Sequence, residues 1–294
     1  VVKCSVKGAW MSKTPKNNKN VDSQTFTYDA LGNVKTCISN VVGGNPCTST
    51  YTYDTLSNSR LEKVDHAAHP DYPATATLQY DSEGRVTQDQ NGKKYSYDGL
   101  GRLIKAGSSV YTYDPLNRFM GHGEGQNQRH IVYDGLQVRG EIDPTDTRTG
   151  RYLSPGSAAC TVQRVRRSEV DRLLLEMRDF DGTVLVSYDL SADTMKHHAY
   201  SAYGEHFSEE KDSLLGFNGE FRDPNTDQYP LGQGYRWYAP DSMQFHAQDS
   251  LSPFGLGGPQ AYGYCNGNPA NLKDRTGHFS VNNRLYEAWG GNVP

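Results

Sequence analysis

Aromatic and β-branched residues alternate with polar residues in many short stretches of this chain. Four examples are Thr25-Phe26-Thr27-Tyr28, Tyr51-Thr52-Tyr53, Tyr95-Ser96-Tyr97 and Tyr111-Thr112-Tyr113. A period of two is typical of a strand that is half-buried on one face. No segment keeps a helical period for more than a turn or two, and the one short helix that we expect is at 209–215. The pattern therefore predicts an all-β fold.

Many of these stretches end in a Tyr-Asp pair, which is followed by Gly or Asn and then by a basic or polar residue. The pairs are Tyr28-Asp29, Tyr53-Asp54, Tyr80-Asp81, Tyr97-Asp98, Tyr113-Asp114 and, in a degraded form, Tyr133-Asp134. An aspartate in this place accepts hydrogen bonds from nearby backbone N–H groups, and the following Gly or Asn tolerates a positive φ. We interpret the aspartates as turn formers, and the tyrosines as residues that pack their rings and keep their hydroxyls in water. Each unit is then a β-hairpin, and the tandem series predicts a long meandering sheet.

Composition limits the function classes. Aromatic residues make up 11% of the 294 residues while hydrophobic residues make up only 35%, and the mean hydropathy is −0.76. This balance indicates a thin, Gly-rich β-structure with much wetted surface. A net charge of −4 gives no support to nucleic-acid binding. No apolar run reaches membrane-spanning length, and the first residues are neither a signal peptide nor an initiator methionine, so the sequence looks like a fragment of a longer chain.

The five cysteines are widely spaced, without a Cys-x-x-Cys pair for zinc. Cys37 and Cys47 could close one loop in an oxidising compartment. The adjacent His197 and His198 would point to opposite faces of a strand, which makes them poor joint metal ligands. We expect no metal and no cofactor.

The texture of the chain divides it into four parts. Residues 1–20 are polar and predicted to be a disordered or lead-in segment, and residues 21–199 are the YD-repeat β-sheet. From residue 200 to 278 the repeat gives way to irregular Gly-, Pro- and Tyr-rich motifs. Residues 279–294 form a short tail, which is too short to fold as a domain of its own.

In this last region the chain resembles the RHS/YD-repeat proteins with a C-terminal RHS-associated core domain, and it is similar to pseudomonad YD-repeat proteins and Tc toxin C components. The motifs that carry the resemblance are Leu215 to Asp223-Pro224, Gly234-Tyr235-Arg236, Asp249 to Gly255, and Tyr262 to His278. The resemblance implies that the hairpins form part of a hollow spiral shell, with residues 200–278 as an irregular plug. It also implies an upstream RHS shell or Tc B-type component, a C-terminal toxin cargo, and secretion or delivery by a bacterial export or injection system.

The resemblance further implies that the core domain is an aspartyl autoprotease acting in cis. Hydrolysis of a peptide by carboxylates needs one group to activate water and another to protonate the leaving nitrogen. Asp249 and Asp274 match the family's two motif aspartates, and Arg236 matches its arginine, which could lower a carboxylate pKa or steady an oxyanion. The implied scissile bond is His278–Phe279.

Two positions depart from the family's pattern. Arg275 replaces a proline in the final Asp-Pro-x-Gly motif, and Gln244 replaces an arginine before Phe245. Proline presets φ, so its loss could loosen the turn that presents the bond. Whether the chain is an enzyme therefore stays open at this point.

The alternative is a non-catalytic YD-repeat scaffold that binds carbohydrate or a partner protein, with Asp249 and Asp274 as further turn aspartates. Trp237, Tyr235 and Tyr238 could offer a stacking platform for sugar rings. We favour core packing for these three aromatic residues.

Overall fold

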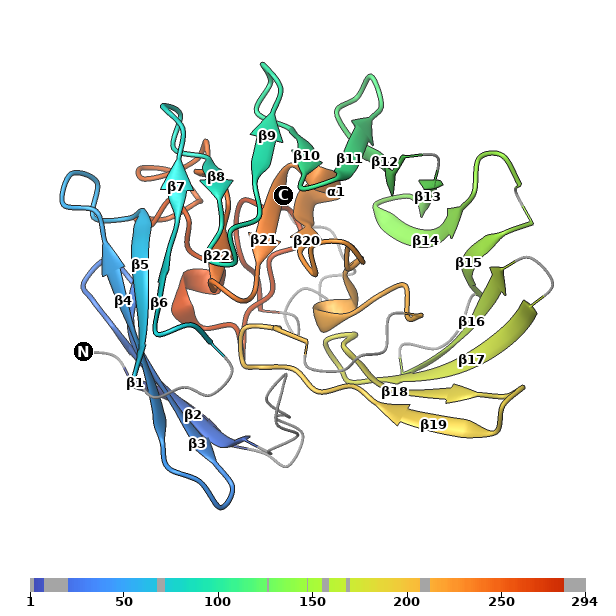
Figure 1. The fold of residues 1–294 in the computed structure, drawn as a ribbon, viewed down its shortest axis with the longest axis horizontal. Coiled ribbons are helices and arrows are strands. Elements are labelled where there is room, and N and C mark those ends of the chain that lie inside the picture. Colours follow the sequence, from blue (N-terminus) through green and yellow to red (C-terminus); the bar gives the residue numbers. More distant parts are fainter. Residues whose placement is uncertain are drawn as a thin grey trace. The chain divides into compact units, whose positions relative to one another are not determined.

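A computed structural model describes residues 3–7, 21–67, 72–125, 127–146, 148–154, 159–167, 170–206 and 212–282 (Figure 1). The chain divides into two compact units, and the segments after residue 198 contribute to both. Unit 1 comprises Val1–Tyr95, Ala199–Phe207 and Arg236–Pro294, and unit 2 comprises Ser96–His198 and Ser208–Tyr235. The boundary at residue 200 that we expect from the sequence remains a prediction.

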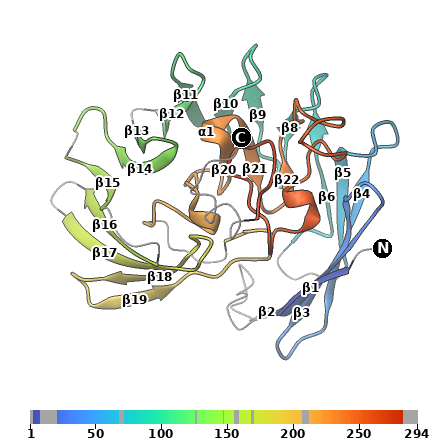
Figure 2. The ribbon, with the colours of Figure 1, turned by 180° about the vertical axis from the view of Figure 1, so that it is seen from behind.

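Unit 1 contains an antiparallel sheet whose strands follow chain order, β1-β2-β3-β4-β5-β6 (Figure 2). Two further antiparallel pairs, β7 with β8 and β21 with β22, lie in the same unit. Strand β1 falls within the polar segment 1–20, of which residues 8–20 lie outside the described part of the chain. The elements of unit 1 are β1 (Lys3–Lys7), β2 (Val21–Tyr28), β3 (Val34–Val41), β4 (Cys47–Tyr53), β5 (Leu61–Ala67), β6 (Thr75–Thr77), β7 (Gln79–Tyr80), β8 (Val86–Gln88), β21 (Arg236–Ala239), β22 (Gln244–Phe245) and the 3-10 turn η2 (Cys265–Gly267).

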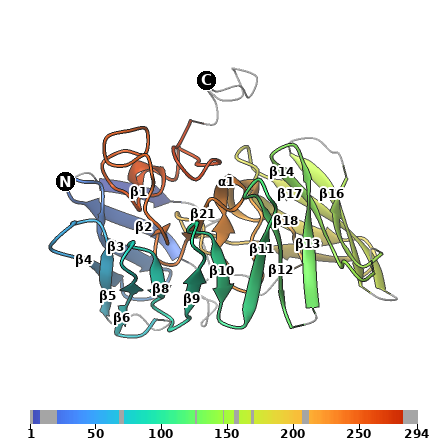
Figure 3. The ribbon, with the colours of Figure 1, turned by 90° about the horizontal axis from the view of Figure 1, so that it is seen from above.

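Unit 2 contains a longer meander of the same kind, in the order β19-β18-β17-β16-β15-β14-β13-β12-β11-β10 (Figure 1). Figure 3 shows its strands β10 to β14 from another side. Strand β9 (Tyr95–Tyr97) lies where the chain passes from one unit to the other. The elements of unit 2 are β10 (Leu103–Ala106), β11 (Ser109–Tyr113), β12 (Phe119–Glu124), β13 (Asn127–Asp134), β14 (Gln137–Ile142), β15 (Gly150–Leu153), β16 (Cys160–Arg167), β17 (Val170–Arg178), β18 (Val184–Asp189), β19 (Thr194–His197), the 3-10 turn η1 (Phe217–Gly219), β20 (Tyr229–Pro230) and α1 (Leu231–Gly234). The expectation of an all-β fold built from tandem hairpins is confirmed.

Four of the six repeat aspartates form the turns that the sequence predicts. One carboxylate oxygen of each accepts backbone N–H groups from the residues two and four positions further on, over 2.8–3.1 Å. The second oxygen accepts Nε of an arginine four residues on at three of the turns. The residue three positions on has a positive φ, between 64° and 88°, which is why Gly or Asn occupies it. The aspartates that form this turn are Asp29, Asp81, Asp98 and Asp114.

Another turn of this kind has no tyrosine before its aspartate. Asp89 follows Gln88, and its carboxylate accepts the N–H groups of Asn91 and Lys93 at 2.8 and 2.9 Å. Gly92 takes the positive φ of 79°. The Tyr-Asp pattern does not include this repeat, whereas an Asp with Gly three residues on indicates it.

Several hydroxyls of the repeat tyrosines bond to protein groups, whereas we expect from the sequence that they stay in water. The hydroxyls of Tyr53, Tyr80, Tyr113 and Tyr133 each donate to a backbone carbonyl that follows the turn of an earlier hairpin, at 2.7–3.0 Å. The acceptors, in the same order, are the carbonyls of Val34, Leu61, Leu103 and Phe119. A backbone carbonyl at this distance satisfies a hydroxyl that burial removes from water. The tyrosine of one repeat therefore fastens it to its predecessor.

The short helix expected at 209–215 is wrong for its described residues, 212–215, which are not helical. Gln163 accepts the backbone N–H of Leu214, and Arg151 binds the carbonyl of Ser213. These backbone groups bond to side chains of the sheet instead of to a helical turn. The described helix α1 lies further on and contains left-handed φ values at Gly232 and Gln233.

Two expectations about cysteine and histidine can also be compared with the structure. Cys37 and Cys47 are both thiols and are not bridged to each other. Cys37 is buried and receives a hydrogen bond from Gln24, and burial raises the pKa of its thiol to about 12.

His197 is exposed while His198 is buried, which confirms that they lie on opposite faces. Within the described part of the chain, no helix has the length and apolar character needed to cross a membrane.

Candidate functional site

Arg236 is the first residue of β21, and an aromatic core fixes its position. Strand β21 pairs with β22 through Tyr238 and Phe245, and both residues are almost fully buried. The Arg236 guanidinium carbon lies 3.7 Å from the centre of the Phe245 ring. This cation–π contact holds the planar head of the arginine in one orientation.

The Arg236 guanidinium brings together the residues that the sequence singles out. Its Nη2 lies 3.2 Å from Oδ2 of Asp249 and 3.9 Å from Oδ2 of Asp274. Its Nη1 donates to the carbonyl of Ala261 at 3.0 Å, and its Nε donates to the carbonyl of Gly277. The side chains of Arg236, Asp249 and Asp274 are only 1–4% exposed. We refer to Arg236, Asp249, Asp274, Gly277 and His278 as the carboxylate cluster.

Asp274 makes a turn and also faces the arginine. Its Oδ1 accepts the backbone N–H groups of Thr276 and Gly277 at 3.0 and 2.7 Å. The turn thus forms although Arg275 stands where the family has proline. Burial raises the pKa of Asp274 to about 6 from its usual 3.8, with the Arg236 charge acting in the opposite direction.

The implied cleavage site lies in a loop whose two ends are paired. Lys273 and Val281 exchange both backbone hydrogen bonds, at 3.0 and 2.9 Å. Inside the loop, the backbone N–H groups of His278 and Phe279 lie within 3.1 and 3.3 Å of the Thr276 hydroxyl oxygen. The loop therefore holds the His278–Phe279 segment beside the carboxylates.

The imidazole of His278 touches one of those carboxylates, which the sequence did not indicate. Its Nδ1 lies 2.8 Å from Oδ1 of Asp249, and the side chain is 27% exposed. Oδ1 also accepts the N–H of Leu251 at 3.0 Å. Asp249 therefore has three donors around it, counting Arg236.

Two buried carboxyls beside a peptide segment are groups that could act as base and acid in peptide hydrolysis. The structure brings Arg236, Asp249, Asp274 and His278 together, with Phe279 next in the chain. The Arg236 Nε contact is to the carbonyl one residue before the implied bond. Among the described residues, no group of three or more His, Cys, Asp or Glu side chains is placed to hold a metal ion.

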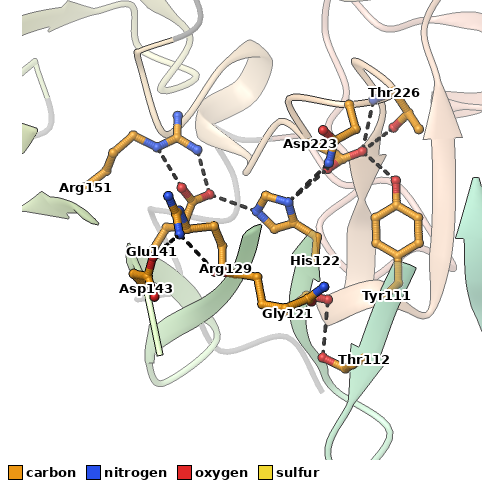
Figure 4. Close-up of polar contacts among 12 residues, drawn as sticks. Tyr111, Thr112, Gly121, His122, Arg129, Glu141, Asp143, Arg151, Asp223 and Thr226 are labelled. Atoms are coloured by element: carbon orange, nitrogen blue, oxygen red, sulfur yellow. Dashed lines mark hydrogen bonds and ion pairs between the residues drawn. The ribbon is translucent and has the colours of Figure 1, made fainter. Parts of the chain in front are cut away.

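Unit 2 holds a second buried polar cluster that the sequence did not reveal (Figure 4). His122 lies between two carboxylates: its Nε2 is 2.9 Å from Glu141, and its Nδ1 is 3.6 Å from Asp223. Arg151 donates to Glu141 through Nε and Nη2, at 3.3 and 2.7 Å, and Tyr111 donates to Asp223 at 2.8 Å. Burial would raise the pKa of Glu141, but Arg151 and His122 hold it well below its usual value. These contacts fasten Asp223 to the sheet.

The aromatic residues considered as a sugar platform are largely in the core. Trp237 and Tyr238 are 3% and 1% exposed, whereas Tyr235 is 38% exposed. A stacking platform needs accessible ring faces, so the core-packing interpretation is confirmed for Trp237 and Tyr238.

Known proteins with a YD-repeat shell resemble this chain. Residues 13–124 match the family model of the Teneurin YD-shell. Among solved structures, the chain is similar to TcdB2-TccC3, with 16% identity and a TM-score of 0.60 over 93% of this chain and 17% of that one. It is also similar to the Photorhabdus luminescens Tc holotoxin pore carrying a mutated TccC3, with 17% identity and a TM-score of 0.62 over 94% of this chain and 16% of that one.

The chain spans about a sixth of the length of the two solved chains, and no curated protein matches it. At these identities the structural likeness shows a shared fold. Residues 13–124 therefore match the YD-shell family, and nearly the whole chain shares its fold with the Tc toxin structures.

Proposed function

We propose that this chain is part of a YD-repeat shell of a toxin. The fold shared with the Tc toxin structures extends over nearly the whole chain but over only a sixth of theirs, which supports a piece of a larger wall. On this proposal the partners are the rest of the shell, or a Tc B-type component, and a toxin cargo that follows the core region at 200–278. Delivery would be by bacterial secretion or injection.

We further propose that the carboxylate cluster hydrolyses its own chain between His278 and Phe279. The observation that carries this proposal is the Arg236 guanidinium, which contacts both carboxylates and the Gly277 carbonyl. A catalytic pair of carboxyls must differ in role. Asp249 has only donors for neighbours, which suits a base, and burial raises the pKa of Asp274 to about 6, which suits an acid.

In the proposed reaction, Asp249 takes a proton from a water molecule, and the water oxygen bonds to the His278 carbonyl carbon. The bond from that carbon to the Phe279 nitrogen then breaks, and the proton of Asp274 passes to this nitrogen. The products are a chain that ends in the His278 carboxylate and a segment that begins with the Phe279 amine. Arg236 positions the adjacent Gly277 peptide and balances the charge of the carboxylates.

A folded reporter fused after Pro294 tests this proposal. We expect the reporter to separate from the wild-type chain and to stay attached in Asp249→Asn and Asp274→Asn. Asp241→Asn is a matched control, because Asp241 is a half-buried acid of unit 1 outside the carboxylate cluster, and its side chain bonds to Asn91. A reporter that stays attached in the wild-type chain would contradict self-cleavage and favour the non-catalytic scaffold.

A further inference from the structure

We infer that His278 is a positioning residue for the cleavage of its own peptide bond, an inference that rests on the proposed function. The residue would supply the carbonyl that is attacked and, through its side chain, would orient the base. The evidence is the 2.8 Å contact between its Nδ1 and Oδ1 of Asp249.

The imidazole and the guanidinium bind different oxygens of Asp249. Arg236 Nη2 lies 3.2 Å from Oδ2, on the other side of the carboxylate from the His278 ring. A carboxylate oxygen can only accept, so the His278 Nδ1 must carry the proton of this bond. Two side chains on opposite oxygens fix the rotation of the carboxyl group, as partners of a catalytic base do elsewhere.

Close packing around Asp249 restricts the orientation of its carboxylate. A methyl group on Gly257 would lie 2.6 Å from Oδ2 of Asp249, so the chain packs closely against that oxygen. The carboxylate side chain is 1% exposed. A hydrophobic residue at 278 would leave Oδ1 with the Leu251 N–H and without its side-chain donor, which is costly for a buried charge.

The contact between His278 and Asp249 also predicts how many bonds one chain can cut. Because His278 and Gly277 are held by Asp249 and Arg236, the new C-terminal end stays in the site after the cut. The chain would therefore act once, on itself, and not on other chains.

Substitutions at position 278 test this inference through intact mass measured over time. Asn can place its Nδ2 near the position of the imidazole Nδ1, whereas Gln places its donor further out and Leu has no donor. We expect His278→Asn to cleave within a few-fold of the wild-type rate, and His278→Gln and His278→Leu to be at least tenfold slower, as the loss of a hydrogen bond to a charged group implies. His197→Leu serves as the matched control, because His197 is an exposed histidine outside the carboxylate cluster, and its rate should be close to wild type.

Each outcome supports or overturns the positioning role of His278, self-cleavage, or both. Rescue by Asn but not by Gln, at equal thermal stability, supports positioning, because a merely structural role would not separate these two variants. If His278→Leu cleaves at the wild-type rate while Asp249→Asn does not cleave, the role of His278 is overturned and self-cleavage stands. If Asn, Gln and Leu are equally slow at equal stability, the positioning role is also overturned. A wild-type chain that does not cleave overturns both proposals.

Discussion

The hydroxyl of Tyr53 donates to the backbone carbonyl of Val34 over 3.0 Å, and this bond joins one YD hairpin to the hairpin before it. Tyr113 makes the same contact with Leu103, also at 3.0 Å. Burial raises the pKa of Tyr53, so the phenol stays protonated and keeps its donor. The tyrosine of the repeat thus has two functions, as a packed ring and as a fastener between repeats.

Removing one of these hydroxyls should destabilise the fold without changing its core. Tyr53→Phe and Tyr113→Phe keep the ring but leave a carbonyl without this donor. We expect each to lower the free energy of unfolding by about 1 kcal/mol, the usual net value of such a bond. Urea unfolding followed by circular dichroism measures the change, and a midpoint equal to that of the wild type would contradict the fastening role.

Two glycines of the same turn type should respond differently to alanine. Gly84 and Gly92 both have a positive φ, of 76° and 79°, so each substitution incurs roughly 1 kcal/mol of backbone strain. A methyl group on Gly92 meets no atom within 4 Å, but on Gly84 it would lie 2.6 Å from the Tyr262 hydroxyl. Gly84→Ala should therefore lower the unfolding midpoint clearly more than Gly92→Ala. Equal effects would mean that the close packing at Gly84 is not present in solution.

Loss of the Arg236 charge should damage both stability and cleavage. Arg236→Met leaves two carboxyls in a buried site without their cation, and breaking a buried ion pair in this way costs about 3–5 kcal/mol. Arg148→Met is a matched control, since Arg148 pairs with Asp146 at the surface and its loss should cost about 1 kcal/mol or less. A similar loss of unfolding free energy in both variants would contradict the burial of the carboxylate cluster.

The ionisation of Asp274 predicts the pH dependence of both properties. Its pKa in the folded chain is about 6, against a usual 3.8, so the folded state holds this proton more tightly than the unfolded state. The contribution to stability is complete below about pH 4 and is lost as the pH rises through 6, a change of about 3 kcal/mol. Asp274→Asn should remove this part of the pH dependence, as measured by thermal unfolding from pH 4 to pH 8.

If Asp274 is the acid of the reaction, wild-type cleavage should also slow as the pH rises above about 6. Asp241 provides the comparison, because burial and the nearby Asp89 raise its pKa to about 6 as well. Asp241→Asn should flatten part of the stability profile while leaving the cleavage profile unchanged. A cleavage rate that is constant between pH 5 and pH 8 would exclude Asp274 as the acid.

Local signals in the sequence predict much of this fold, because the turn of each repeat depends on only a few residues. An Asp that accepts two nearby N–H groups and a Gly with a positive φ suffice, as the Asp98 turn shows. The Arg236, Asp249 and Asp274 set could be found only through the family resemblance. Nothing in their spacing indicates that one guanidinium would contact both carboxylates.

The features that the sequence did not reveal depend on contacts between distant segments. His122 and Asp223 are about a hundred positions apart, and their proximity follows from the packing of the 212–226 segment on the sheet of unit 2. His278 meets Asp249 because the Lys273–Val281 pairing closes the loop around it. The hydroxyl of Tyr53 finds its carbonyl only once two hairpins are side by side. Periodicity and turn chemistry do not encode such tertiary contacts.

The intact mass of the purified chain, measured beside that of Asp249→Asn, is the sharpest test of self-cleavage. Self-cleavage predicts a wild-type chain that ends at His278 and has lost residues 279–294, while Asp249→Asn keeps its full mass. A cut after Gly277 instead would give a chain shorter by one histidine and would move the reacting bond to the carbonyl that Arg236 contacts. A wild-type chain that keeps its full mass at pH 5 and at pH 7 would contradict self-cleavage.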